Sequence, residues 1–118
     1  MADAGLFIGW GDAVRGREGQ AVELFNEVLA FYERLREEGT IESFEPVFLE
    51  PHGGDLSGFV LIRGDAEKLA ALWVSEAFNQ LGLRALLVVD SFGVVGADPG
   101  ERLQRQMEYY IEQIGAFA

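Results

Sequence analysis

One histidine in a short, acidic and glycine-rich segment is the first residue of this sequence that offers chemistry near neutral pH. His52 is the only histidine among 118 residues, and an imidazole can serve as a general base or bind a metal ion. Glu50 and Asp55 flank it with carboxylates that could orient the ring. The segment also suits a tight turn, because Pro51 fixes φ and the next two glycines allow positive φ. We predict His52 as a catalytic residue and Glu50 and Asp55 as ligand-binding residues, with a purely structural turn as the alternative.

Two charged residues follow apolar runs that are typical of strands. Arg63 comes after Phe-Val-Leu-Ile, and Asp90 comes after Leu-Leu-Val-Val. A charge that points into a protein interior needs an opposite charge or a bound ion, so both residues would anchor a small polar or acidic ligand if they faced inward. We predict Arg63 as a second catalytic residue and Asp90 as a ligand-binding residue. The alternatives are an ion pair of Arg63 with Glu45 or Asp65, and an exposed strand end for Asp90.

Aromatic residues are the remaining candidates for a site. They could line a pocket between a sheet and its helices, or they could simply fill the core. Trp10 is the one that we predict to bind a ligand. The set comprises Trp10, Tyr32, Phe44, Phe48, Phe59 and Trp73.

No catalytic or cofactor motif accompanies these residues. The glycines at positions 9 and 11 lack the third glycine of the dinucleotide-binding pattern, because Val14 stands in its place. The chain also has no P-loop and no serine in a G-x-S-x-G elbow. The absence of cysteine excludes thiol nucleophiles, disulfides and the usual structural zinc sites. With one histidine, a transition-metal site would need carboxylates around it, so the sequence predicts no cofactor and no metal.

Composition limits the partners and the compartment. The formal net charge is -11, and only one of the nine basic residues is a lysine. Nucleic acid and anionic membranes require the opposite, a basic footprint. The N-terminal segment has no basic region, and its short apolar run is broken by glycine, so it predicts neither a signal peptide nor a membrane span. We expect a cytoplasmic protein with neither nucleic acid nor a membrane as its partner.

Hydrophobic patterning predicts the elements that position these residues. An apolar run at residues 4–10 indicates a buried strand. Apolar residues at three- and four-residue spacing over 18–38 indicate an amphipathic helix that Gly39 ends. Residues 41–63 read as two strands joined by a glycine turn, and a second helix is expected over 65–81.

The last part of the chain reads as one more strand and one more helix. The strand is expected over 83–95, a continuous apolar run rich in valine. Asp98 is predicted as the N-cap of the helix, with Pro99 at its first position, and Gly115 as its end.

The central hairpin has a predicted register. A turn centred on its two glycines would place Glu45 opposite Arg63 on one face, with Phe44 and Phe48 on the other. Pro46 cannot donate to a strand ladder, which predicts an edge strand or a bulge.

The order of these elements predicts the fold. Strand, helix, strand, strand, helix, strand is the split βαβ pattern, so we expect a single ferredoxin-like α+β domain over residues 1–118, with an antiparallel sheet and an added C-terminal helix. Several strands lack polar alternation, and water on the second sheet face would leave a large apolar patch exposed. We therefore expect a homodimer that packs sheet to sheet, with the last helix able to wrap its seam.

The chain resembles the dimeric α+β barrel superfamily over about residues 4–96. The resemblance lies in element order and two-sided strands, and the most distinctive string, GxIxxFEPxxLEPHGGDxxGFxLxxG, runs from Gly39 to Gly64. It is similar to small uncharacterised bacterial proteins of that class. The resemblance implies face-to-face packing of two ferredoxin-like subunits. It also implies a range of activities, because the superfamily includes cofactor-free monooxygenases, lactone isomerases, haem-handling enzymes and members without known chemistry.

Three classes of function fit the sequence. The first is a small-molecule binding or interaction module without turnover. The second is a cofactor-independent enzyme of oxygenase or isomerase type, with a small apolar substrate and with His52 and Arg63 as its catalytic residues. The third is a structural dimer subunit of a larger assembly. We expect the first and keep the second as the alternative.

Overall fold

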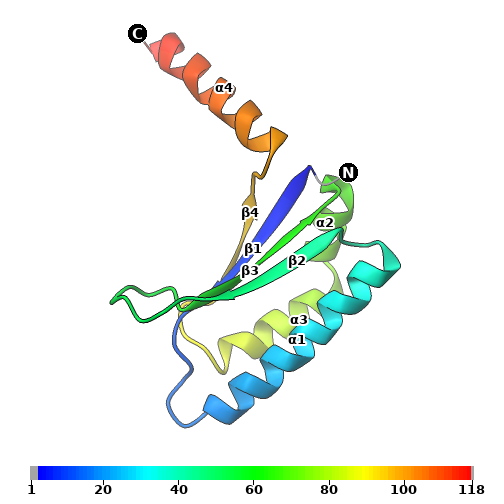
Figure 1. Cartoon of the computed structure of the whole chain (residues 1–118), viewed down its shortest axis with the longest axis vertical. Helices are drawn as coiled ribbons and strands as arrows, with labels where there is room; N and C mark the ends of the chain where they lie inside the picture. Colours follow the sequence, from blue (N-terminus) through cyan, green and yellow to red (C-terminus); the bar gives the residue numbers. More distant parts are fainter. Residues whose placement is uncertain (1–2, 118) are drawn as a thin grey trace.

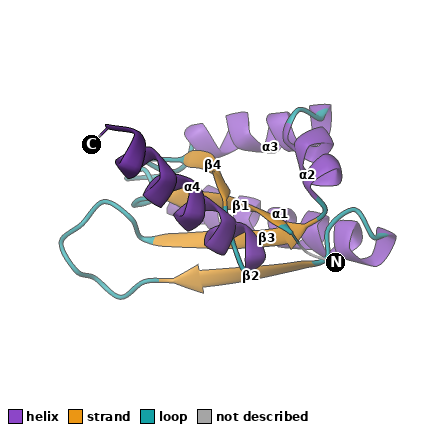
Figure 2. Ribbon diagram, turned by 90° about the horizontal axis from the view of Figure 1, so that it is seen from above, coloured by secondary structure: helices purple, strands orange, loops and turns teal. Residues whose placement is uncertain are grey.

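The computed structural model describes residues 3–117 and contains one four-stranded antiparallel sheet with helices against one of its faces (Figure 1). The sheet order is β2-β3-β1-β4, and Figure 2 shows the strands side by side in that order. This order and the two helical crossovers, α1 in the first and α2 with α3 in the second, define the predicted ferredoxin-like α+β fold. The elements are β1 (Ala4–Trp10), α1 (Glu18–Glu38), β2 (Ser43–Phe48), β3 (Gly58–Gly64), α2 (Ala66–Trp73), α3 (Glu76–Leu86), β4 (Gly93–Ala97) and α4 (Glu101–Phe117).

The first helix and the edge strand agree with the sequence. Helix α1 spans the predicted residues, and Gly39 ends it in the left-handed region at φ +81°, where its N–H donates to carbonyls of the last turn. Strand β2 pairs only with β3 and is therefore an edge strand, as Pro46 predicts.

The predicted hairpin register is wrong by two residues. Glu45 lies opposite Leu61, and Ser43 lies opposite Arg63. The reason is the connection, which is a loop over residues 49–57 rather than a tight turn at the glycines. A shift of two residues leaves every side chain on its predicted face, because side chains alternate along a strand.

The predicted second helix is two helices. Asp65 caps α2 by accepting a hydrogen bond from the Lys68 N–H at 3.1 Å. Ser75 caps α3 in the same way, by accepting from the Phe78 N–H at 3.3 Å. A new N-cap interrupts the helix because the backbone of the capping residue is extended.

The predicted fourth strand is mostly wrong. Residues 83–86 complete α3, and β4 begins only at Gly93. The segment between α3 and β4 pairs with the loop between β1 and α1, through an isolated antiparallel bridge of Ala13 with Val89. The physical reason is that a short apolar run without polar alternation fits a helix end as well as a buried strand.

The core lies between the sheet and the helices. Alternate residues of the central strands point into it, and Ile62 is fully buried. The core cluster comprises Ala4, Leu6, Ile8, Tyr32, Leu35, Ile41, Val60, Ile62, Leu69, Leu72 and Phe78.

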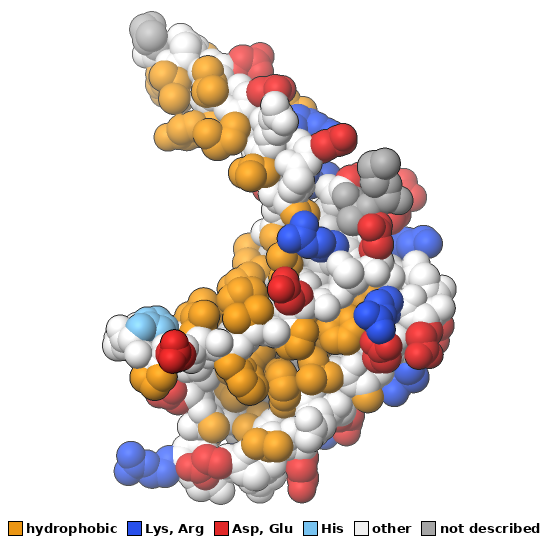
Figure 3. Space-filling view, in the orientation of Figure 1, with side chains coloured by type: hydrophobic (Ala, Val, Ile, Leu, Met, Phe, Trp, Pro, Cys, Tyr) orange, Lys and Arg blue, Asp and Glu red, His pale blue; other side chains and the backbone are white. Residues whose placement is uncertain are grey.

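Helices α1, α2 and α3 leave the other sheet face uncovered (Figure 1), and the strand register places apolar side chains on it. The rings of Phe7 and Phe59 stack on it with centroids 5.0 Å apart. We call this surface the open face, and it consists of Phe7, Val47, Phe59, Leu61 and Val95. Figure 3 shows hydrophobic side chains along this side of the molecule, in a hollow below α4.

Helix α4 extends away from the rest of the chain (Figure 1). It begins at Glu101, and Asp98 accepts a hydrogen bond from the Arg102 guanidinium at 3.0 Å instead of capping the helix N-terminus. The helix also continues past Gly115, where the sequence predicts its end. None of the α4 residues, all of which are described, is buried.

Candidate functional site: a cavity between sheet and helices

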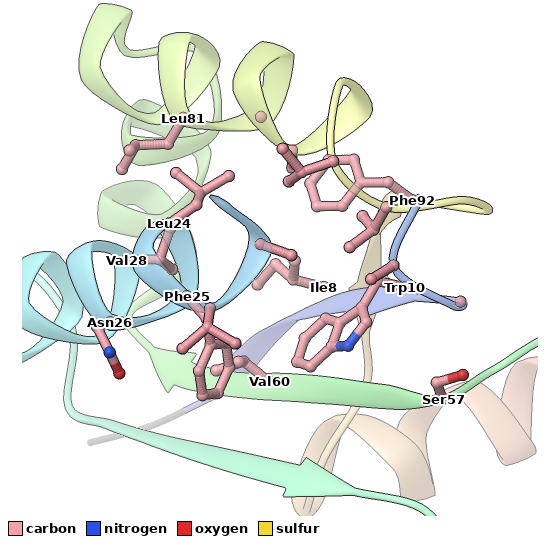
Figure 4. A pocket seen from close by; sticks show the side chains of 18 of the residues that line it. Ile8, Trp10, Leu24, Phe25, Asn26, Val28, Ser57, Val60, Leu81 and Phe92 are labelled. Carbon is pink, nitrogen blue, oxygen red and sulfur yellow. The ribbon is translucent and has the colours of Figure 1, made fainter. Parts of the chain in front are cut away.

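A cavity of about 710 Å³ lies between the helix-facing side of the sheet and helices α1 and α3 (Figure 4). Its wall is mostly apolar, with Ile8 and Val60 from the sheet, Leu24 from α1 and Leu81 from α3. Exposed residues such as Val22 on α1 also line it, so the cavity opens to solvent. Small-molecule sites typically have volumes of about 300–1,000 Å³ and are lined mainly by hydrophobic and aromatic residues.

Three aromatic rings from three elements form one wall. The ring centroid of Trp10 lies 5.6 Å from that of Phe25 and 6.3 Å from that of Phe48, and the Phe25 and Phe48 centroids are 5.2 Å apart. These spacings allow favourable edge-to-face and tilted contacts. The outermost ring, Phe48, is 70% exposed, so an apolar surface reaches the mouth of the cavity.

Glycine at position 58 makes room for the indole of Trp10. Gly58 is the cross-strand partner of Trp10, and a Cβ added there would lie 2.7 Å from the indole ring. No real side chain tolerates that distance, so Gly58 is what allows Trp10 to lie over β3.

The segment after α3 closes the cavity near Trp10. The Gly11 N–H donates to the Asp90 carbonyl at 2.7 Å, and the Asp90 N–H donates to the Asp12 carbonyl at 2.8 Å. The Val14 N–H donates to the Val88 carbonyl at 2.8 Å. These bonds hold Val88, Val89 and Phe92 at the cavity wall.

Polar groups are few along the cavity wall, and Tyr32 is the most deeply buried of them. The residue is only 3% exposed, and no hydrogen bond joins its hydroxyl to another residue within 3–117, but the hydroxyl oxygen itself is not sealed from solvent. Burial raises the pKa of the Tyr32 phenol above its usual value, so the hydroxyl keeps its proton and can donate a hydrogen bond. At the rim, Asn26 is exposed, and Asp12 accepts a hydrogen bond from the Ser57 hydroxyl at 3.1 Å.

Trp10 is the predicted ligand-binding residue that lines this cavity. Of the other aromatic candidates, Tyr32 and Phe48 also line it, whereas Phe59 belongs to the open face. The sequence did not single out Phe25 or Phe92 as site residues. Phe25 was indistinguishable from the rest of the apolar stripe of α1, and Phe92 lay in the segment predicted as a strand.

His52 lies in the exposed loop between β2 and β3, with both ring nitrogens engaged by that loop. Nε2 is 2.8 Å from the Leu56 carbonyl oxygen, and Nδ1 accepts a hydrogen bond from the Gly54 N–H at 3.2 Å. This pair of contacts fits the neutral tautomer that carries its proton on Nε2. Glu50 and Asp55 are exposed in the same loop.

Arg63 and Asp90 lie at different ends of the sheet. Arg63 is exposed near the end of β3, where β3 pairs with the start of β1. Asp90 is exposed beside Gly11, at the other end of β1. Over residues 3–117, the cavity lining includes none of Glu50, His52, Asp55, Arg63 and Asp90. The roles predicted for these five residues stay predictions.

Over residues 3–117, no group of three or more His, Cys, Asp or Glu side chains is arranged to hold a metal ion. None of the helices in the same range is long and apolar enough to cross a membrane.

Comparison with known proteins gives matches at the level of structure only. No protein-family model matches the chain, and no curated protein matches its sequence. A dimeric protein of unknown function and ferredoxin-like fold from Bacteroides fragilis is similar, with a TM-score of 0.58, 10% identity, and coverage of 81% of this chain and 96% of its own. A dimeric ferredoxin-like protein of unknown function from Jannaschia has a TM-score of 0.60, 16% identity, and coverage of 82% and 98%.

An enzyme also shares the fold. SnoaB, a cofactor-independent oxygenase from Streptomyces nogalater, is similar with a TM-score of 0.54, 15% identity, and coverage of 84% of this chain and 95% of its own. All three structures are matched almost completely, whereas 16–19% of this chain has no counterpart in them. The element order, the sheet order and these matches agree, and the chain has the ferredoxin-like fold.

Proposed function

We propose that this protein binds a small, mainly apolar molecule in the cavity between the sheet and helices α1 and α3. The observation that carries the proposal is the cavity itself, about 710 Å³ in volume and walled by the rings of Trp10, Phe25 and Phe48. The apolar atoms of the cavity wall lack packing partners on one side, and a bound ligand would supply the missing dispersion contacts.

The wall favours a flat and uncharged ligand with a hydrogen-bond acceptor. Aromatic rings present flat faces to a ligand, and the protonated Tyr32 hydroxyl, which has no partner within residues 3–117, suits a carbonyl or ether oxygen. Asp12 and Glu18 at the rim, together with the net charge of -11, disfavour an anion.

Ligand binding is tested with a matched pair of substitutions on α1. Ala21 lines the cavity, whereas Ala30 is exposed elsewhere on the same helix. We expect Ala21→Phe to fill part of the cavity and weaken binding of the neutral fluorescent probe 1-aminoanthracene by about tenfold or more, equivalent to at least about 1.4 kcal/mol. Ala30→Phe should bind as the parent does. The measurement is a fluorescence titration, and equal affinities for both variants would exclude the cavity as the binding site.

A second candidate is cofactor-independent oxygenation of the bound molecule. The shared fold with the oxygenase SnoaB and the apolar, partly enclosed cavity favour it. In a balanced form of the reaction, an activated CH₂ group of an electron-rich arene reacts with dioxygen. One oxygen atom becomes the carbonyl oxygen, and the other leaves as water with both hydrogens. The sequence predicts His52 and Arg63 as the catalytic residues of this candidate, but neither of them lines the cavity that would hold the substrate.

Oxygen uptake separates turnover from binding alone. We expect uptake with an anthrone-type substrate to fall in Ala21→Phe but not in Ala30→Phe, because only the first substitution narrows the cavity. The measurement uses an oxygen electrode. A parallel loss in His52→Ala and Arg63→Ala, with folding retained, would support their catalytic roles. Tight binding of the arene by the parent protein without any uptake would leave the binding module as the function.

The proposed partner is a second copy of the chain, packed against the open face. Phe7, Phe59 and Leu61 lie together there without a covering layer from α1, α2 or α3. Exposed apolar patches of several hundred Å² usually mark interaction sites. The two similar proteins from Bacteroides fragilis and Jannaschia are described as dimeric, which supports self-association of this chain.

A further inference from the structure

We infer that α4 is a dimerisation arm whose apolar stripe packs against a second copy of this chain. The inference goes beyond ligand binding, and it adds the C-terminal helix to the proposed packing of open faces. Its starting point is that the apolar side chains of α4 are not buried by any other part of their own subunit within residues 3–117.

The stripe runs along one side of the helix. Its members are spaced alternately by four and three residues, which is the spacing of helices that pack lengthwise against another element. Each is at least half exposed, although together they would form an ordinary buried helix face. We call this surface the α4 stripe, and it consists of Leu103, Met107, Tyr110, Ile114 and Phe117.

Charges are absent from the borders of the stripe. On an ideal helix, the positions that flank it are taken by Gln104, Gln106, Ile111 and Gln113. The charged residues of α4 lie on the remaining surface, and they are Glu101, Arg102, Arg105, Glu108 and Glu112. Two copies of a chain with a net charge of -11 repel each other, so a surface built for self-association must keep acidic groups out of the contact, as this one does.

The α4 stripe and the open face lie around one hollow. Figure 3 shows hydrophobic side chains along the inner side of α4 and along the sheet beneath it. A two-fold dimer uses the same surface on both subunits, so a second copy seated on the open face would also meet the α4 stripe. The arm therefore continues the proposed sheet interface rather than forming an unrelated one.

The part of this chain without a counterpart in the similar structures, 16–19%, is comparable in length to α4 and the turn before it. A membrane surface is a weaker occupant for the stripe, because α4 has more acidic than basic residues and the whole chain is acidic.

A pair of substitutions two residues apart tests the arm. Ile114 lies in the α4 stripe and Ala116 lies well outside it, so Ile114→Glu and Ala116→Glu add the same charge to different sides of one helix. We expect Ile114→Glu to raise the dimer dissociation constant by about tenfold or more in sedimentation equilibrium, and Ala116→Glu to leave it within about twofold. Equal dissociation constants for the two variants would overturn the proposal.

Single cysteines give a second readout that does not depend on a disruptive charge. The chain has no native cysteine, so Tyr110→Cys and Ala116→Cys each supply one reactive thiol on α4. We expect maleimide labelling at position 110 to slow as protein concentration rises, with labelling at position 116 unaffected. Protection at position 110 that does not change with concentration would mean that its own subunit covers the stripe. Protection only with phosphatidylcholine vesicles would assign the stripe to a membrane surface, and either result would refute the arm.

Discussion

Replacing Ile62 with alanine lowers the free energy of unfolding by about 2–5 kcal/mol. Ile62 is fully buried in β3, between the sheet and the helices, and belongs to the core cluster. Removing its outer carbons leaves a void that neighbours on two flanking strands and α1 can only partly close. Chemical denaturation of the monomeric fraction, at low protein concentration, measures the loss.

Leu61 supplies the matched control for Ile62. It is adjacent in β3 but points to the open face, where it is only half-buried. Leu61→Ala should lower the free energy of unfolding of the isolated subunit clearly less than Ile62→Ala does. Its main effect should be weaker self-association at higher protein concentration. If both substitutions destabilised the monomer equally, the assignment of the two sheet faces would be wrong.

Replacing Gly11 with alanine is expected to push apart two backbone segments that lie next to Trp10. A Cβ at position 11 would lie 2.8 Å from the Asp55 carbonyl oxygen and 3.0 Å from that of Asp90. Both obstacles are backbone atoms, so the loop before β3 or the segment after α3 has to move. We expect a loss of about 1–3 kcal/mol in the free energy of unfolding. We also expect weaker binding of 1-aminoanthracene, because the same segments support the cavity wall.

Gly19 is the control for Gly11. A Cβ there would meet no atom within 4 Å, and the residue lies in the first turn of α1. Gly19→Ala should therefore stabilise the protein by up to about 1 kcal/mol, since alanine loses less backbone entropy in a helix. Thermal or chemical denaturation measures the stability of both variants. We expect the two substitutions to change the free energy of unfolding in opposite directions. A destabilised Gly19→Ala, or a neutral Gly11→Ala, would contradict this account of the two glycines.

The sequence predicted the fold correctly where a single hydrophobic period ran through a long segment. The stripe of α1 and the glycine after it gave both ends of that helix, and Pro46 indicated the edge strand. Prediction failed over residues 83–95, because an apolar run without polar alternation carries no period to read. The capping residue Ser75 was the missed signal. It starts α3 and carries the helix into the run that resembled a strand.

The candidate site was much less readable than the fold. Residue types drew attention to His52 and Arg63, which are both exposed and lie outside the cavity lining. Trp10 is one of the aromatic residues that the sequence offered as a pocket lining between sheet and helices, and it does line the cavity. A cavity is defined by atoms that are missing between elements, and no local pattern in a sequence records how far a helix lies from a sheet.

The two ends of helix α1 pack against different parts of the molecule. Near its C-terminal end, Leu35 packs with the core cluster, while Leu24 and Phe25 near its start face the cavity. Cavity-lining residues such as Ala21 and Phe25 lie outside the core cluster, whereas Ile8 and Val60 belong to both. Evolution or a protein engineer could therefore change the shape of the cavity at the start of α1 while most of the core packing is kept.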